Sequence, residues 1–252
     1  MSINALILLV LLFFITSVVG VVTGSNSLIT VPVMFQFGVE PKIAVATNMF
    51  GLTFMNIGAS LPFIKEGVID YKRLSPLVVI TLFASALGAL LVGIVSSEVI
   101  PIIVSVSMIV VALFVLLKRD SGGSEAKEVS KGALVITLVL TFFLGIYGGL
   151  YSGGYVTILT AVFVAFFGMT FTEAIAGTKF INVFSSAIAS AIFAWQGLID
   201  YKLGIILAVT MFVAAYIGAR TVTKMSDLWL KRIFTATVFL LALKTIFDYT
   251  IV

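Results

Sequence analysis

The sequence Gly67-Val68-Ile69-Asp70-Tyr71-Lys72 occurs again, with one substitution, as Gly197-Leu198-Ile199-Asp200-Tyr201-Lys202. The same spacing between the two copies also pairs Gly88-Ala89 with Gly218-Ala219. An internal repeat of this length indicates that one structural unit is present twice. The sequence therefore predicts two related halves.

The repeat continues upstream of these turns with small changes of spacing. Ala46-Thr47-Asn48 pairs with Gly177-Thr178-Lys179, and further upstream Ser25-Asn26-Ser27 pairs with Ser152-Gly153-Gly154. The one strongly polar stretch, Lys118 to Gly132, separates the halves and has the composition of a linker. We predict a first membrane repeat at 1–118, a cytoplasmic linker at 119–132 and a second membrane repeat at 133–252.

The composition places both halves in a membrane. Hydrophobic residues make up 61% of the chain and charged residues 10%, against roughly 45–50% and about 25% in soluble domains. Apolar windows of about 20 residues, long enough to cross a hydrocarbon core about 30 Å thick, recur along the sequence. The first apolar run, from Ile3, lacks a preceding basic region, so we expect a retained membrane segment instead of a cleaved signal peptide.

The apolar runs predict an all-α integral membrane fold built from two repeats. Each repeat opens with a longer apolar run, 3–38 or 133–168, that Gly, Ser and Asn residues interrupt in the middle. These runs predict a broken opening segment or hairpin, made of two shortened pieces. Three full transmembrane helices are expected to follow in each repeat, near 42–64, 74–95 and 99–117 and near 172–195, 203–222 and 230–247.

The positions of the basic residues predict the orientation, because short loops rich in Lys and Arg stay in the cytoplasm. One copy of the repeated turn then lies in the cytoplasm and the other outside, so the halves are inverted relative to each other, as in many secondary transporters. We expect a multi-pass protein of the cell membrane, with both chain ends on the external side. Three basic regions carry this argument: Lys65, Lys72 and Arg73; Lys118, Arg119, Lys127 and Lys131; and Arg220, Lys224, Lys231 and Arg232.

Several of these features together resemble the TauE/SafE family of sulfite exporters and related anion permeases. They are the broken opening segment, the Ala-Val-Ala-Thr and Ala-Gly-Thr helix openings, the Gly-x-Ile-Asp-Tyr turn, and the stretch from Gly197 to Phe234 with Gly218-Ala219-Arg220 and Leu230-Lys231-Arg232. The resemblance covers almost the whole chain. It implies transport of sulfite, sulfonates or other small organic anions.

The interruptions in the opening runs are the first candidate site. Backbone that leaves helical geometry within a membrane exposes N–H groups, and the N-terminus of a half-helix carries partial positive charge that favours anions. The alternative is that Gly and Ser only allow close helix packing. The candidate substrate-binding residues here are Ser25, Asn26, Ser27, Ser152, Gly153 and Gly154.

Lys179 is the second candidate, because it lies roughly 10 Å inside its predicted helix at 1.5 Å per residue. A cation at that depth usually marks a transport pathway. A substrate anion could compensate its charge, with Thr178 and Asn182 nearby and with Asn48 and Thr47 supplied by the other half. The alternative is that the long side chain snorkels to the interface.

The leading hypothesis is a secondary transporter that moves a small anion, such as a sulfur oxyanion, organosulfonate or carboxylate, by alternating access between its halves. The sequence contains no P-loop motif, so we expect a coupling ion, proton or sodium, or uncoupled transport. A passive anion channel and, less favoured, a membrane-embedded enzyme remain alternatives. No His or Cys occurs, and we expect no catalytic residues, cofactor, metal site or nucleic-acid partner. The oligomeric state stays open.

Overall fold

The structure, a computed structural model, describes residues 2–24, 26–117 and 129–236, and within these residues the chain is helical and contains no strand. The helices of the first half are α1 (Ile3–Thr23), α2 (Asn26–Gln36), α3 (Pro41–Lys65), α4 (Tyr71–Ile94) and α5 (Val99–Leu117). Those of the second half are α6 (Lys131–Leu150), α7 (Tyr155–Ala165), α8 (Phe171–Trp195) and α9 (Tyr201–Val222). Residues 227–236 are also helical, and the rest of the span predicted near 230–247 lies outside the described residues.

Five of the predicted spans begin and end within one helical turn of their expected positions. They correspond to α3, α4, α5, α8 and α9. The prediction of two shortened pieces in each opening run is wrong for the first piece. Helices α1 and α6 have 21 and 20 residues and are long and apolar enough to cross a membrane, as are α3, α4, α8 and α9. Within the described residues of the opening runs, only the second pieces, α2 and α7, are short, with 11 residues each.

The repeated turn ends one membrane helix and starts the next. Gly67 and Gly197 follow α3 and α8 with φ of 66° and 69°, in the left-handed region that glycine adopts without a Cβ clash. Asp70 and Asp200 then cap α4 and α9, because each carboxylate accepts a hydrogen bond from the backbone N–H three residues later, at 3.0 and 3.1 Å. This local chemistry explains why nearly the same six-residue sequence occurs between the equivalent helices of each half.

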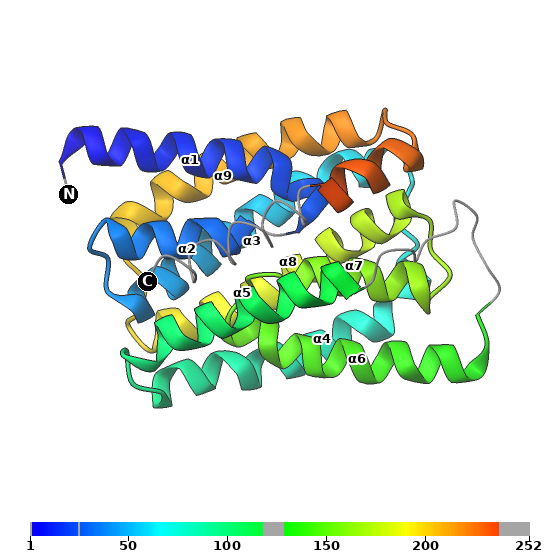
Figure 1. The fold of residues 1–252 in the computed structure, drawn as a ribbon, viewed down its shortest axis with the longest axis horizontal. Helices are drawn as coiled ribbons and strands as arrows, with labels where there is room; N and C mark the ends of the chain where they lie inside the picture. Colours follow the sequence, from blue (N-terminus) through cyan, green and yellow to red (C-terminus); the bar gives the residue numbers. More distant parts are fainter. Residues whose placement is uncertain (1, 25, 118–128, 237–252) are drawn as a thin grey trace.

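The two halves pack against each other along most of their length. Helix α3 lies against α8 and α9, α4 lies against α6 and α8, and α1 lies against α9. In Figure 1, α3 and α9 run from left to right, whereas their counterparts α8 and α4 run from right to left. The two copies of the repeated turn consequently lie at opposite ends of the bundle.

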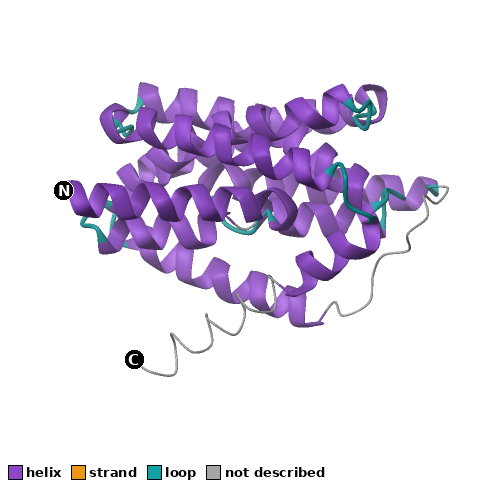
Figure 2. Ribbon diagram, turned by 90° about the horizontal axis from the view of Figure 1, so that it is seen from above, coloured by secondary structure: helices purple, strands orange, loops and turns teal. Residues whose placement is uncertain are grey.

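The opening helices of each half form a hairpin whose turn lies inside the bundle. Most loops lie at the two ends of the molecule in Figure 2, and a short one lies between them. The turn between α1 and α2 and the turn between α6 and α7 are buried, with Asn26 3% exposed and Ser152 5% exposed. The sequence breaks therefore occur within the protein, where backbone groups can be satisfied by other protein groups.

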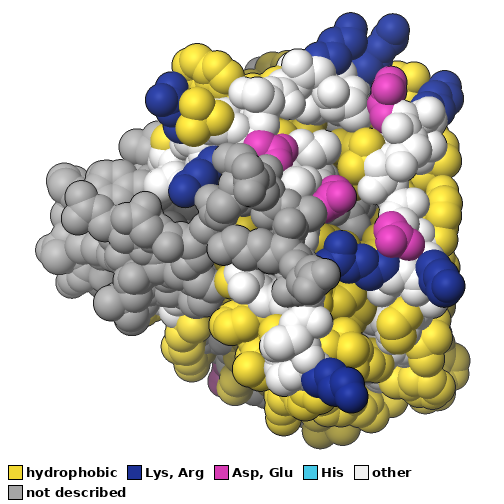
Figure 3. Space-filling view, turned by 90° about the vertical axis from the view of Figure 1, so that its right-hand side faces the viewer, with side chains coloured by type: hydrophobic (Ala, Val, Ile, Leu, Met, Phe, Trp, Pro, Cys, Tyr) yellow, Lys and Arg dark blue, Asp and Glu magenta, His cyan; other side chains and the backbone are white. Residues whose placement is uncertain are grey.

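Basic side chains gather at one end of the bundle. Figure 3 views this end, where α3 and α9 finish and α4, α6 and α8 begin, and shows Lys and Arg side chains with fewer Asp and Glu among them. At the opposite end the described helices carry Lys42 and Lys202. Three residues of the second predicted basic region, Lys118, Arg119 and Lys127, lie outside the described residues.

Candidate functional site

The two breaks, which are far apart in the sequence, meet in the middle of the bundle. The Thr157 hydroxyl of α7 donates a hydrogen bond of 2.6 Å to the Thr23 carbonyl at the end of α1. The Tyr151 hydroxyl, from the turn between α6 and α7, donates a bond of 2.9 Å to the Ser27 carbonyl in α2. These contacts join the two hairpins at their turns.

Two short helices begin at this meeting point. Helix α2 starts at Asn26, and α7 starts after Gly154, whose φ of 80° turns the chain into the helix. Gly154 has no side chain to cap α7, and neither helix has an acidic residue in its first turn. The partial positive charges of two helix N-termini therefore lie close together here, and the first turn of neither helix holds a carboxylate that would offset them.

Asn48 ties the first break to α3. Its side-chain oxygen accepts a bond of 2.8 Å from the Thr30 hydroxyl, and its amide nitrogen donates a bond of 2.9 Å to the Ser27 hydroxyl. All three side chains are buried. The sequence-based prediction named Asn48 and Ser27 and missed Thr30, which lies one helical turn after Asn26.

Lys179 lies with its ammonium inside the protein. The side chain is 2% exposed, and its Nζ donates a hydrogen bond of 2.7 Å to the Gly20 carbonyl in the last turn of α1. No Asp or Glu of the described residues forms an ion pair with it. The side chain does not snorkel to the end of α8, because it points across the bundle to the other half.

The neighbours of Lys179 on α8 are also buried. The Thr178 hydroxyl donates to the Ile175 carbonyl at 3.0 Å and lies 3.3 Å from the Thr160 hydroxyl of α7. Asn182 is 2% exposed, and its side-chain oxygen has no hydrogen-bond partner among the described residues. Thr178 therefore links α8 to α7, whereas Asn182 keeps an unused acceptor.

The remaining predicted residues have different positions. Thr47 turns toward the start of α9, where its hydroxyl accepts a bond of 3.0 Å from the Asp200 N–H. The Ser152 and Gly153 carbonyls accept hydrogen bonds from the Tyr155 N–H and the Tyr147 hydroxyl, within the second break. Ser25 lies outside the described residues. Asn26 is buried beside Gly20, and its side-chain oxygen has no partner in the described part of the chain.

Sequence reasoning missed the groups that hold the two halves together at this point. Gly20, Thr23 and Thr157 contribute through backbone carbonyls or a hydroxyl within apolar runs, and nothing in the sequence sets them apart. Tyr151 could have been found, since it directly precedes the predicted break at Ser152. A polar aromatic residue at a mid-membrane break needs a hydrogen-bond partner when it is buried.

Comparison with known proteins identifies the family. The profile of the sulfite exporter TauE/SafE family matches residues 9–245. The chain belongs to this family. Three relatives with the name "probable membrane transporter protein" align with most of this TauE/SafE protein. The family, these relatives and the long apolar helices together identify a multi-pass membrane transporter. No solved structure matches the chain.

The relatives come from three bacteria. ORF9 of Sinorhizobium sp. is 27% identical over 208 residues, which cover 82% of this chain and 79% of the relative. The Haemophilus influenzae protein is 23% identical over 247 residues, 98% of this chain and 96% of the relative. YfcA of Escherichia coli K12 is 26% identical over 219 residues, 86% of this chain and 81% of the relative.

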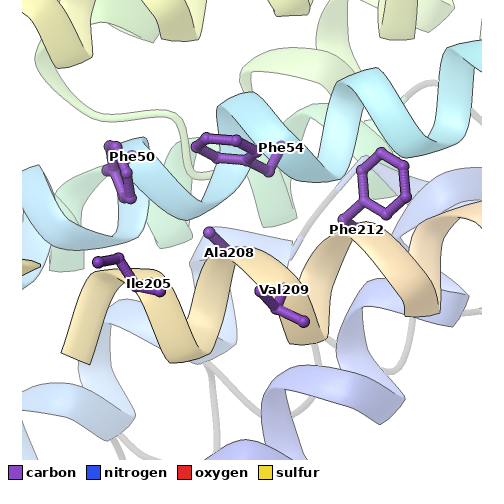
Figure 4. Close-up of a pocket in the computed structure, with 6 residues that line it drawn as sticks. All are labelled: Phe50, Phe54, Ile205, Ala208, Val209 and Phe212. Atoms are coloured by element: carbon purple, nitrogen blue, oxygen red, sulfur yellow. The ribbon is translucent and has the colours of Figure 1, made fainter. Parts of the chain in front are cut away.

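One pocket of this TauE/SafE protein lies away from the breaks, between α3 and α9, and has a volume of about 190 Å³. Figure 4 shows its six lining residues, which are Phe50, Phe54, Ile205, Ala208, Val209 and Phe212. Every lining side chain is apolar, and Ile205 and Val209 are 56% and 62% exposed on the surface that would face lipid. A pocket without a polar group cannot compensate a charged solute, so the breaks remain the candidate site.

Proposed function

We propose that this protein is a secondary transporter for a small anion, which binds where the two breaks meet and reaches the two sides of the membrane alternately. The observation that carries the proposal is the buried Lys179 ammonium. A buried cation without a carboxylate partner is costly in a membrane protein. A substrate anion would remove that cost each time it binds.

The hydrogen-bonding capacity of Lys179 fits this role. A lysine ammonium has three N–H donors, and the Gly20 carbonyl accepts one of them. Two donors are left for an anion. The N-termini of α2 and α7 add further partial positive charge at the same place, and helix N-termini bind oxyanions readily.

The substrate class follows from the charge and from the family. We favour a sulfur oxyanion such as sulfite, an organosulfonate or a carboxylate, since each carries several acceptor oxygens and the family is described by sulfite export. The oxygens of such an anion can accept bonds from the ammonium and from backbone N–H groups at once. In this arrangement Asn48 and Thr30 hold the first break in shape.

Alternating access is supported by the opposite directions of the equivalent helices. Two inverted halves can exchange conformations, so that a site at their interface opens first to one side and then to the other. The basic end of the bundle, with Lys65, Lys72 and Arg73 and with Arg220 and Lys224, then faces the cytoplasm of the cell. The described candidate side chains at the centre are at most 5% exposed, which fits a closed stage of such a cycle better than an open pore.

Exchange across vesicle membranes tests the proposal. Purified protein is reconstituted into vesicles loaded with unlabelled sulfite, methanesulfonate or acetate, and uptake of the same labelled anion is followed at constant pH and salt. A carrier gives saturable uptake that the internal unlabelled anion accelerates. Uptake without saturation or acceleration would indicate a channel, and no specific uptake of any of these anions would reject the proposal.

A further inference from the structure

Helix α1 ends inside the protein, and its end is a place of negative potential. The helix finishes at Thr23, is capped by Gly24 with φ of 69°, and has no basic residue in its last turn. The last four carbonyl groups of a helix lack their usual intrahelical donors, and together they carry about half a negative charge. A buried helix end of this kind attracts a cation.

The cation that stands there belongs to the other half of the chain. Lys179 of α8 brings its ammonium 2.7 Å from the Gly20 carbonyl. That carbonyl also accepts the Gly24 N–H at 2.9 Å. The ammonium is therefore an additional partner, and the Gly20 carbonyl would keep a hydrogen bond if Lys179 were replaced.

Two buried side-chain oxygens, one on a residue beside this helix end and one on the helix that carries Lys179, have no donor. The side-chain oxygens of Asn26 and Asn182 are both buried and lack a hydrogen-bond partner in the described part of the protein. Asn26 lies against α1, since a Cβ built at Gly20 would be 3.1 Å from the Asn26 Cβ. Asn182 is about one helical turn from Lys179 on α8. Neutral carbonyl oxygens beside a helix C-terminus are the ligands with which membrane transporters hold Na⁺.

From this geometry we propose that the Lys179 ammonium stands in the place of a monovalent metal cation at the end of α1. No Na⁺ is then needed at this place, because the positive charge that another transporter would take from solution is attached to α8. Removing the ammonium and its stem should leave a site that Na⁺ can occupy. This inference rests on the proposed anion transport, to which it adds the source of the positive charge next to the substrate. The melting experiment that tests it requires no anion substrate.

The chain offers a matched control for the test. Lys42 also donates to a carbonyl in the last turn of a helix, Gly93 in α4, at 3.4 Å. Gly93 is exposed and the bond lies at the protein surface, where water can replace the ammonium. Loss of Lys42 should therefore create no requirement for a cation.

The experiment compares the melting temperatures of the purified wild-type protein, Lys179→Ala, Lys179→Met and Lys42→Ala. Each is measured in sodium chloride, in choline chloride and in methylammonium chloride at one ionic strength, without any added substrate anion. Lys179→Ala opens space for a cation, whereas the Met side chain fills that space without charge. A ligand that binds only the folded state stabilises it by mass action.

We expect Na⁺ to raise the melting temperature of Lys179→Ala relative to choline saturably, by roughly 5 °C or more at about a hundredfold excess over Kd, and methylammonium serves as the positive control that replaces the lost ammonium. The wild-type protein, Lys179→Met and Lys42→Ala should melt at the same temperature in all three salts. Recovery of folded Lys179→Ala in Na⁺ but not in choline would also support the proposal.

Two results would overturn the inference. One is a folded Lys179→Ala protein that Na⁺ does not stabilise relative to choline, or a variant that fails to fold in all three salts. The other is a wild-type protein that Na⁺ itself stabilises relative to choline. Because no anion substrate is present, either result leaves the proposed anion transport untouched, and a failure of vesicle exchange leaves this test valid.

Discussion

Replacing Lys179 by Met removes the buried positive charge while keeping an unbranched side chain of similar length. The Gly20 carbonyl would lose the 2.7 Å bond from Nζ and keep the 2.9 Å bond from the Gly24 N–H. No carboxylate of the described residues would be left unpaired, because none forms an ion pair with Lys179. We therefore expect the variant to fold, since losing one hydrogen bond to a charged group is partly offset by no longer burying a charge.

The effect on anion binding should be large. If the two remaining N–H donors of Lys179 hold the anion, the variant loses a charge-assisted contact of about 1.5–3 kcal/mol, which corresponds to a roughly tenfold to more than a hundredfold increase in Kd. Lys179→Arg should give an intermediate Kd, because the charge stays while the donor geometry changes.

Titration calorimetry with sulfite, at fixed salt and pH in one detergent, measures these constants directly. Lys42→Met serves as the control, because it removes a charge that also faces a backbone carbonyl but lies at the exposed end of the bundle. A folded Lys179→Met protein that binds sulfite with the wild-type Kd would refute the assignment. The Asn48 contacts and the two helix N-termini would then be the remaining candidates.

Two other predictions follow from the fold. Single cysteines at Tyr71 and Tyr201, which are both half exposed, should react with a membrane-impermeant thiol reagent from opposite faces of the membrane; labelling of both from one face would contradict the inverted arrangement. Gly24→Ala should lower the melting temperature more than Gly67→Ala: both force a Cβ into the left-handed region, at about 1–2 kcal/mol, but only at Gly24 does the Cβ also meet a neighbour, Val156 Cγ1 at 2.7 Å. Equal shifts would mean that the meeting of the two breaks is not tightly packed.

The sequence predicts the helices well because each membrane helix is determined by local chemistry. The apolar length and the Gly and Asp residues of the repeated turn are sufficient to place both ends of α3 and α8 within one residue. The opening runs are harder to divide, because Gly20, Gly24 and the Ser and Asn residues that follow are all possible breaks. In the structure the left-handed Gly24 ends α1 only after a full membrane-crossing length.

The partners of the site residues could not be predicted, because they are backbone groups or lie on distant helices. Lys179 bonds to the carbonyl of Gly20, 159 residues away, and a carbonyl gives no signal in a sequence. Thr47 shows the opposite error: it sits beside Asn48, but the next position on a helix points about 100° away. Its hydroxyl therefore contacts the start of α9 and not the break.

The repeat itself explains why one residue of a matched pair carries charge and the other does not. Asn48 and Lys179 occupy equivalent positions in the two copies of the repeat. Two lysines there would place two buried cations close to one interface, which mutual repulsion and loss of hydration oppose. With Asn48 fixing the first break through two neutral hydrogen bonds, Lys179 supplies the one positive charge. On the proposed function, a bound anion therefore meets one full positive charge, and the partial charges of the two helix N-termini add to it.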